Sequence, residues 1–506
     1  MSGTSPQPPP GSVRSRLPDR APRRTRPHRP APSSEPPTED ALTLFASLWA
    51  VVALFHVLTS GHAEQIVSDA TTLGLSYVLL AMCAFWLLAR PAYNLPLMLV
   101  AVLGLVTAWQ EAPILGNHWL LVAFVDLALL LSAPAVSGKG GINRDRLAEV
   151  FLPLARWCLV LFYSFAAFAK LNSAFFDTAV SCGTYYFDET ARSWGFDTPL
   201  AVGAGGPARL LPFVTVVTEL SIPALLLNRR TRSFGVVLGL CFHSLIALDR
   251  LHQFVDFSSV LAALFVLFLP ARFAASALGF LKGRGARLLI LWVALASLVI
   301  AAEWIGSNIF FDFVFLEGRF FIWYVFDATI LLGVVMWSVR HRRQALERPF
   351  TFQGSGSIWL AVVPVLLVVN GLLPYFELRT AYAFTMYSNL RMVDGMSNHL
   401  IVGSSLPLAS RQVDLVKVVA SSDPGLGLYA TDDYLLPWDS FRAYLAEHPE
   451  VAIIYERGGK GYVVHRASDD PELVTPPPLL VQKLLAMRAV DGNDEPRCQD
   501  VFFPAL

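Results

Sequence analysis

Charged residues are scarce in this chain of 506 residues. They make up 15% of the sequence, whereas 54% of the residues are hydrophobic, and the formal net charge is zero. This apolar fraction is more than the core of a soluble protein of this length can bury. The composition therefore indicates a polytopic membrane protein, and nothing in it suggests nucleic-acid binding.

Familiar catalytic and metal-binding motifs are also missing. The sequence has no CxxC or HExxH spacing, so it predicts no metal site. The glycines around Lys460 have no helix after them, and we interpret them as a turn and not as a phosphate-binding loop. No internal repeat is recognisable, which argues against the inverted-repeat transporters.

Cysteine is rare as well, with five residues in the chain. Cys83, Cys158 and Cys241 fall within apolar stretches, where a free cysteine is usually a small packing residue. Cys182 and Cys498 lie outside those stretches. If both face an oxidising compartment a disulfide between them is permitted, although a sequence does not supply its geometry.

Long apolar stretches are what the sequence has in abundance. Each is near the length that a bilayer core of about 30 Å requires of a helix. They lie at 41–59, 73–89, 95–110, 118–135, 150–169, 210–227, 234–249, 254–271, 288–306, 320–339 and 357–374. The expected fold is therefore mainly α, a polytopic helical membrane protein of about 11 spans.

Basic residues predict the orientation of these spans. The first 40 residues form a Pro- and Arg-rich segment without an obvious cleavage site, which we interpret as a disordered cytoplasmic tail before a retained signal anchor. The loops on the same side of the membrane as this tail then hold 15 basic residues. The opposite loops hold only Lys170, Arg192, Arg209, Arg250 and Arg319. The positive-inside rule thus predicts a cell-membrane protein with its amino terminus in the cytoplasm and its carboxyl terminus outside.

The sequence changes character after Pro374. Short strands are expected at 416–419 and 428–430, a hairpin at 452–455 and 462–465, and helices at 438–447 and 478–489. These segments predict a small extracytoplasmic α+β domain. The expected organisation is a tail at 1–40, a transmembrane domain at 41–375 and this outer domain at 376–506.

Ionisable residues inside or beside the spans are candidates for a functional site, because the bilayer makes them costly. Lys170 closes the fifth span at the same surface at which Asn117 and His118 open the fourth. Lys170 could equally be a lysine at the membrane boundary that extends its amine to the interface and has no role in a site. His118 could likewise be an interfacial residue beside Trp119.

Two further candidates fall at matched depth. Glu219 and His243 each lie twelve residues from Thr231, in the turn between the sixth and seventh spans, and could form a pair. Such a pair could carry chemistry or simply hold two helices together. Asp126, below His118, is another buried carboxylate candidate.

Several of these segments resemble the HTTM domain, the membrane domain of vitamin K-dependent gamma-carboxylases and of bacterial relatives. The resemblance covers about residues 40–405. It is carried by the Ala-Lys-Leu-Asn core at Lys170, by Asn117-His118, by Glu219 through Pro223, by Phe242-His243, and by the segments Ser388-Asn389-Leu390-Arg391 and Ser397-Asn398-His399-Leu400.

The resemblance implies a quinone-linked enzyme, lyase-like in its chemistry, that modifies an exported peptide or protein. Lys170 would be the general base that deprotonates a reduced quinone, and His118 would orient or protonate the quinone oxygen. Asn117, Glu219, His243, Arg391, Asn398 and His399 would be substrate- or quinone-binding residues. The chain departs from the carboxylases in having Ala169 before the lysine and a much smaller outer domain.

Two other functions remain open from the sequence. The chain could be a transporter or channel that uses Glu219, His243 and Asp126 as a proton or solute path. It could also be a noncatalytic membrane protein that matures or chaperones an exported partner. Membrane lipid is an expected partner in each case.

Overall fold

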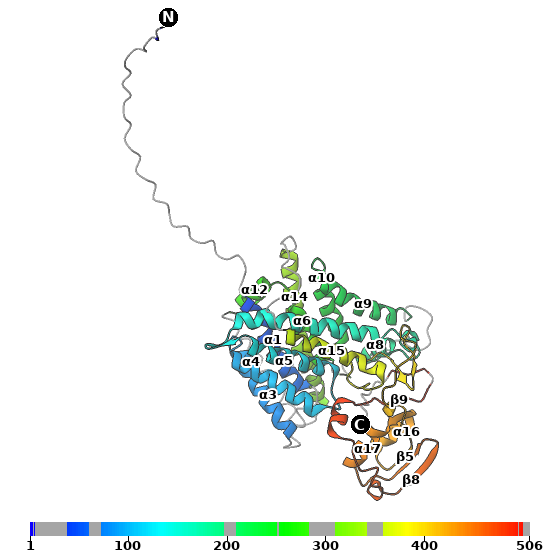
Figure 1. Cartoon of the computed structure of the whole chain (residues 1–506). Coiled ribbons are helices and arrows are strands. Elements are labelled where there is room, and N and C mark those ends of the chain that lie inside the picture. The colour runs from blue at the N-terminus through cyan, green and yellow to red at the C-terminus, as the bar shows by residue number, and fades with distance from the viewer. Residues whose placement is uncertain are drawn as a thin grey trace. The chain divides into compact units, whose positions relative to one another are not determined.

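The computed structural model of the chain describes residues 1–3, 5, 38–59, 72–196, 209–249, 252, 254–282, 309–341, 358–493 and 495–498. Over these ranges the protein is mainly helical, with a small sheet region near its C-terminal end (Figure 1). The expected span at 288–306 and most of the expected tail at 1–40 lie outside the described residues.

The helices follow the apolar stretches closely. They are α1 (Thr38–Thr59), α3 (Thr72–Ala89), α4 (Asn94–Glu111), α5 (Asn117–Ala135), α6 (Arg144–Ala169), α7 (Ser173–Phe176), α8 (Cys182–Ser193), α9 (Leu210–Leu227), α10 (Arg232–Ile246), α11 (Val255–Val266), α12 (Ala271–Leu281), α14 (Ile309–His341) and α15 (Val362–Leu372). Apart from 288–306, each expected span coincides with at least part of one of these helices. The helices α7 and α8 are short, and they lie in the connection after Lys170.

Seven helices among the described residues are long and apolar enough to cross a membrane, or up to eight if one bent pair counts as a span. The bent pair is α11 and α12, which meet at 117°. The segment expected as a span at 254–271 is therefore not one straight helix, because α11 ends at Val266 and the chain bends before α12. Pro270, just before α12, disfavours a helical conformation of the residue that precedes it and lacks the N–H that a continuing helix needs.

Helix α11 lies at the centre of the helix packing. It packs against α1, α5, α6, α10 and α14, and nearly all of its residues are buried. Its first turn carries Asp256, whose side chain is buried. Helix α1 is similarly enclosed, since 78% of its apolar window is buried. Polar side chains near the ends of these helices therefore meet one another and not solvent.

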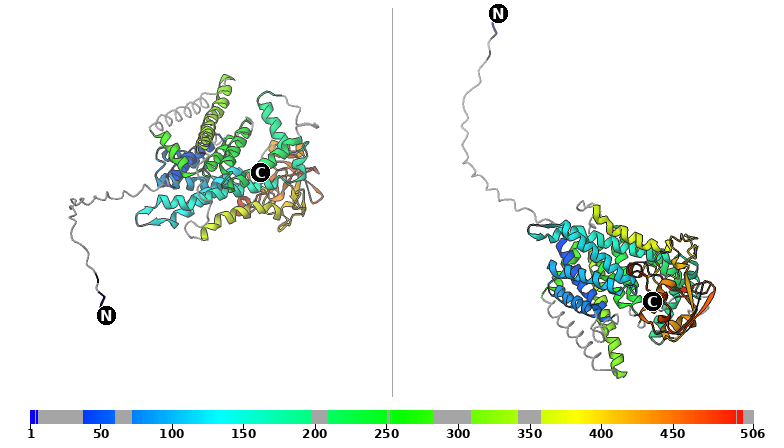
Figure 2. Two further views of the ribbon diagram at one scale, coloured as in Figure 1. Left: turned by 90° about the horizontal axis from the view of Figure 1, so that it is seen from above. Right: turned by 60° about the horizontal axis from the view of Figure 1, so that its bottom comes forward.

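Five antiparallel strands form the sheet region, in the order β8-β7-β5-β6-β9. They are β5 (Leu415–Ser421), β6 (Tyr434–Pro437), β7 (Ile453–Arg457), β8 (Lys460–Val464) and β9 (Val490–Asp491), with α16 (Pro424–Asp432) and α17 (Trp438–Glu447) packed against them. Val416, Leu436 and Phe441 are fully buried in their shared core. Figure 1 and the right-hand view of Figure 2 show these strands gathered together, apart from the long helices.

The expected elements of this region are mostly present. The hairpin of β7 and β8 is confirmed, and its turn residues Gly458 and Gly459 have φ values of 57° and 75° that favour glycine. The expected strand at 428–430 is wrong, because those residues belong to α16. Asp423 caps that helix by accepting a hydrogen bond from the Leu426 N–H at 2.8 Å. The last helix, α18 (Leu479–Leu484), is shorter than expected.

A disulfide joins Cys182, at the start of α8, to Cys498 near the end of the chain. Hydrogen bonds reinforce this connection, since the Asn389 side chain donates to the carbonyl oxygens of Val180 and Pro496 at 2.8 and 3.0 Å. The ammonium of Lys483 also donates to the Gln110 carbonyl at 3.2 Å, at the end of α4. The C-terminal region is thus tied to the helices at two separate places.

Candidate functional site

Two clusters of buried polar side chains lie among the helices. Both form at the end of the bundle where α1, α4 and α6 finish and α5 and α11 begin. We call the first the lysine cluster (Tyr163, Lys170, Glu219, His243) and the second the histidine cluster (Tyr77, His56, Glu111, His118, Asp256). Each draws its members from at least three helices.

The lysine cluster contains a buried ion pair. Lys170 is the C-cap residue of α6, and its Nζ lies 3.0 Å from the Oε2 of Glu219 on α9. Lys170 is 5% exposed and Glu219 8%. The amine also lies 3.4 Å from the carbonyl oxygens of Ala166 and Met386. Lys170 therefore points into the protein, and the interpretation of it as a lysine extended toward the membrane surface is wrong.

Tyr163 and His243 form the other half of the lysine cluster. The Tyr163 hydroxyl is hydrogen-bonded to the Nε2 of His243 on α10, and both side chains are buried. Tyr163 lies two turns before Lys170 on α6, so one face of that helix supplies a residue to each pair.

The pair expected between Glu219 and His243 is therefore not formed. Helix α6 packs against α9 and supplies nearer partners to both residues, Lys170 to the carboxylate and Tyr163 to the imidazole. The Nδ1 of His243 is buried and has no hydrogen-bond partner among the described residues. That nitrogen is available to a polar atom of a bound molecule.

A continuous chain of hydrogen bonds runs through the histidine cluster. The hydroxyl of Tyr77 donates to Glu111 at 3.0 Å, and the same Glu111 oxygen lies 2.9 Å from the Nε2 of His56. The Nδ1 of His56 lies 2.8 Å from the Oδ2 of Asp256. The Nε2 of His118 lies 2.8 Å from that same oxygen. Two imidazoles from different helices thus converge on one carboxylate oxygen.

Aromatic rings enclose the histidine cluster and connect it with the lysine cluster. The indole of Trp119 is stacked on the His56 ring, with centroids 3.4 Å apart. Phe257 contacts both His118 and His243, at centroid distances of 5.9 and 4.9 Å. The two clusters consequently lie on either side of one phenylalanine of α11.

Two of the other predicted site residues, Asn117 and His399, connect the segment after α15 to the helices, and the other two, Arg391 and Asn398, are bonded to each other within that segment. Asn117 accepts a hydrogen bond from the Phe384 N–H at 2.8 Å, and the His399 ring is hydrogen-bonded to the Phe168 carbonyl at 2.8 Å. Asn398 accepts from the Arg391 N–H at 2.9 Å. Burial lowers the pKa of His399, although its bond to Phe168 opposes that shift. These contacts give the four residues a structural role around Lys170.

Asp126 also has a packing partner. Its carboxylate accepts a hydrogen bond from the indole N–H of Trp49 at 2.8 Å, which connects α5 to α1. Gly104 of α4 leaves room for this carboxylate, since a Cβ at that position would lie 2.2 Å from its Oδ2. Asp126 belongs to neither cluster.

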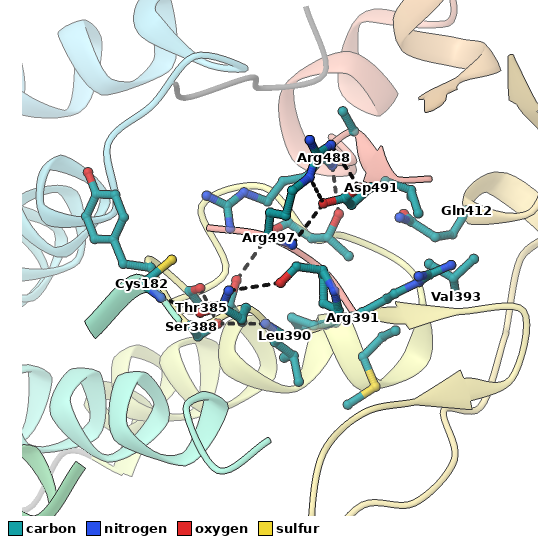
Figure 3. Close-up of a pocket in the computed structure, with 18 residues that line it drawn as sticks. Cys182, Thr385, Ser388, Leu390, Arg391, Val393, Gln412, Arg488, Asp491 and Arg497 are labelled. Atoms are coloured by element: carbon teal, nitrogen blue, oxygen red, sulfur yellow. Dashed lines mark hydrogen bonds and ion pairs between the residues drawn. The ribbon is translucent and has the colours of Figure 1, made fainter. Parts of the chain in front are cut away.

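A pocket lies between the segment at 380–393 and the end of the chain. Figure 3 shows Arg391, Arg488 and Arg497 around it, together with Asp491 and Gln412. Arg497 forms an ion pair with Asp491 at 2.9 Å, and burial lowers the pKa of Arg488. Of the predicted site residues only Arg391 lines this pocket, so it is separate from both clusters.

Sequence reasoning missed five members of the clusters as site residues: Tyr77, His56, Glu111, Asp256 and Tyr163. A usable signal was present, because His56, Glu111 and Asp256 are ionisable residues at the ends of apolar stretches that the expected topology puts at one surface. Tyr163 lacked such a signal, since a tyrosine in an apolar helix is common at membrane boundaries.

Comparisons with known proteins found no match: no family model, curated protein or solved structure matches the chain.

Proposed function

We propose that this chain is an integral membrane enzyme of the vitamin K-dependent gamma-carboxylase-like (HTTM) type, which modifies an exported peptide or protein with Lys170 as its general base. The observation that carries the proposal is the burial of Lys170 in an ion pair with Glu219. A buried ionisable side chain with a specific charge partner is a candidate for a functional site.

Within the ion pair, a proton can reside on the amine of Lys170 or on the carboxylate of Glu219. A lysine amine accepts a proton only when it is neutral. Glu219 can take the proton that the amine releases and pass it on to solvent, which leaves a neutral amine beside a carboxylate. When Lys170 then takes a proton from a substrate, the resulting ammonium lies 3.0 Å from the carboxylate and is stabilised by it. Glu219 is accordingly assigned the role of proton partner to Lys170.

The surroundings of Lys170 fit a reduced quinone. The buried Nδ1 of His243 offers a hydrogen-bonding atom to a quinone oxygen, and Phe257 lies beside that imidazole. Bound there, the quinone would supply the electrons and the strong base of a carboxylation. Tyr163 keeps the His243 ring in place through its hydroxyl. His118 is hydrogen-bonded to Asp256 in the histidine cluster, so we assign it no proton transfer.

The disulfide between Cys182 and Cys498 supports the orientation in which the sheet region faces the outside of the cell. Disulfides persist in extracytoplasmic compartments and are rare in the cytosol. The distribution of basic loops agrees with this orientation. Both clusters would then lie near the outer membrane surface, where an exported peptide arrives.

A carboxylation assay tests the proposal. Purified full-length protein would be incubated with vitamin K hydroquinone, dioxygen, labelled bicarbonate and a glutamate-containing peptide. Label should enter the peptide, and Lys170→Ala and Lys170→Arg should each lower the rate by about 100-fold or more, because arginine keeps the charge but accepts no proton near neutral pH. The exposed Lys417 provides the control, and Lys417→Arg should act like the wild type.

Retained activity in Lys170→Arg would contradict the role of general base. If the wild-type protein incorporates no label, the alternatives separate by two further measurements. Uptake driven by a pH gradient in proteoliposomes would indicate a transporter. Copurification of an exported peptide without turnover would indicate a maturation or chaperone protein.

A further inference from the structure

The histidine cluster has the composition and geometry of a metal site. His56, His118 and Asp256 each offer one donor atom, and these three atoms lie within 4.8 Å of one another. They come from α1, α5 and α11, so the bundle fold itself brings them together. We infer that these three residues bind one divalent transition-metal ion.

The distances between donors suit such an ion. Metal–nitrogen and metal–oxygen bonds of about 2.0 to 2.2 Å put neighbouring ligand atoms about 3 Å apart. The two imidazole nitrogens lie 2.8 Å from the Oδ2 of Asp256. Only small side-chain shifts are needed to admit an ion between them. The separation of the rings, with centroids of His56 and His118 6.4 Å apart, is compatible with this placement.

Contacts behind His56 fix the orientation of its ring, as is usual for histidines that bind a metal. Such a histidine commonly donates its other ring N–H to a carboxylate, which fixes the tautomer and the ring orientation. Here the Nε2 of His56 lies 2.9 Å from Glu111, and Tyr77 in turn donates to that carboxylate. Trp119 covers the ring face. The Nδ1 of His56 is thereby directed at Asp256 and His118.

Charge balance is compatible with an ion at this place. Asp256 and Glu111 have side chains that are only 5% and 7% exposed, and two buried carboxylates require two positive charges nearby. One divalent cation with two neutral imidazoles provides them, as would two imidazolium ions without a metal. The proposal is therefore a choice between one metal ion and two protons, which a metal analysis resolves.

The donor types select the class of metal. Two imidazole nitrogens and one carboxylate oxygen suit zinc, ferrous iron and related ions, whereas calcium and magnesium prefer oxygen ligands alone. Three protein ligands leave at least one coordination position for water or substrate. His118 is 22% exposed in its side chain, which puts the more accessible side of the site at that residue.

Zinc analysis of the purified full-length protein tests the inference. The protein would be loaded with Zn²⁺ in detergent, desalted and analysed for metal content. We expect about one zinc per chain in the wild type, and at least a tenfold lower content in Asp256→Asn and His56→Gln. Asp126→Asn is the matched control, because Asp126 is equally buried in the same bundle but lies outside the cluster. It should retain the zinc.

A spectroscopic measurement on the wild type makes the test independent of whether the variants fold. X-ray absorption at the zinc edge should show nitrogen and oxygen ligands with two imidazoles. Absence of retained zinc, equal zinc in the folded Asp256→Asn variant, or sulfur ligands would each overturn the inference. The metal content does not depend on Lys170, so this result and the carboxylation assay can fail separately.

Discussion

The ion pair of Lys170 and Glu219 is held in a part of the bundle where neither charge is well hydrated. Removing one partner of such a pair leaves the other charge uncompensated, and this costs much more than the pair itself contributes. The exposed pair of Lys417 and Asp433, at 2.9 Å, differs from it in being surrounded by solvent. Two pairs of similar length should therefore respond very differently to substitution.

Glu219→Gln should lower the free energy of unfolding by about 3 kcal/mol, because the Lys170 ammonium loses its carboxylate while it stays buried. Thermal or denaturant unfolding of the protein in detergent measures this. Lys417→Met is the control and should show no resolvable change, since an exposed pair contributes little. Equal stability of Glu219→Gln and the wild type would indicate that Lys170 is hydrated in the folded protein.

Asp491 makes the C-terminal region sensitive to acid. Burial alone raises the pKa of Asp491, but hydrogen bonds from Arg497 and Asn493 outweigh burial, and the pKa falls below its ordinary value of 3.8. A carboxyl whose folded-state pKa is depressed stabilises the fold above its unfolded-state pKa, and this stabilisation is lost as the pH falls through the folded-state value. Unfolding should therefore become easier in strong acid.

Denaturant unfolding of the full-length protein, followed by tryptophan fluorescence near neutral pH and below about pH 3.8, measures this loss. Asp491→Asn should be less stable than the wild type near neutral pH, and the difference should shrink in acid. Asp469→Asn, at an exposed carboxyl, is the control and should follow the wild type at both pH values. A constant difference between Asp491→Asn and the wild type would exclude the depressed pKa as its cause.

At the scale of the helices, close approach of α10 and α11 depends on a glycine. A Cβ at Gly239 of α10 would lie 2.2 Å from the ring of Phe265, which is fully buried on α11. The same two helices carry His243 and Asp256, so their separation also sets the relation between the two clusters. A small residue at this contact is typical of membrane helices that pack tightly.

Gly239→Ala should destabilise the protein by about 1 to 3 kcal/mol, since the ring of Phe265 has no room to withdraw within a packed core. Phe265→Leu in the same chain should recover part of this loss. Gly333→Ala on α14 is the matched control, because nothing lies within 4 Å of the Cβ that it adds. If both alanine variants melt like the wild type, α10 and α11 are not packed as closely as described.

At the scale of the whole molecule, the topology follows from the basic loops and from the parity of the spans. Ser137 lies in the turn between α5 and α6, and Ser422 lies in the sheet region after β5; both are exposed. Seven expected spans separate them, so the expected topology puts them on opposite sides of the membrane. The bend between α11 and α12 is the described feature most able to change that parity.

Cysteines introduced singly at Ser137 and Ser422, in a chain whose Cys83, Cys158 and Cys241 are replaced by alanine, can be labelled in intact cells with a membrane-impermeant maleimide. Ser422→Cys should be labelled from outside, and Ser137→Cys only after the membrane is permeabilised. Labelling of both positions from the same side would require an even number of spans between them, as when α11 enters and leaves by one surface.

The long apolar stretches and the alternation of basic loops were enough to predict a mainly helical membrane protein and the ends of most helices. This is possible because spanning length and hydropathy are local properties of the sequence. The hairpin around Gly458 and Gly459 was predictable for a similar reason, since turn residues act within a few positions. The break at Pro270 and the helix cap at Asp423 were also local signals. In predicting a span at 254–271 and a strand at 428–430, we gave more weight to the apolar residues around them than to these two signals.

The sequence by itself thus determined the class of the protein, its helix positions and the candidacy of Lys170, His118, Glu219 and His243. Only the tertiary structure decided their partners: Lys170 with Glu219, Tyr163 with His243, and His118 with Asp256 and His56. Depth along a helix follows from counting residues, but the direction in which each helix faces depends on which neighbours it packs against. Contacts between helices far apart in the chain therefore set the chemistry of both clusters.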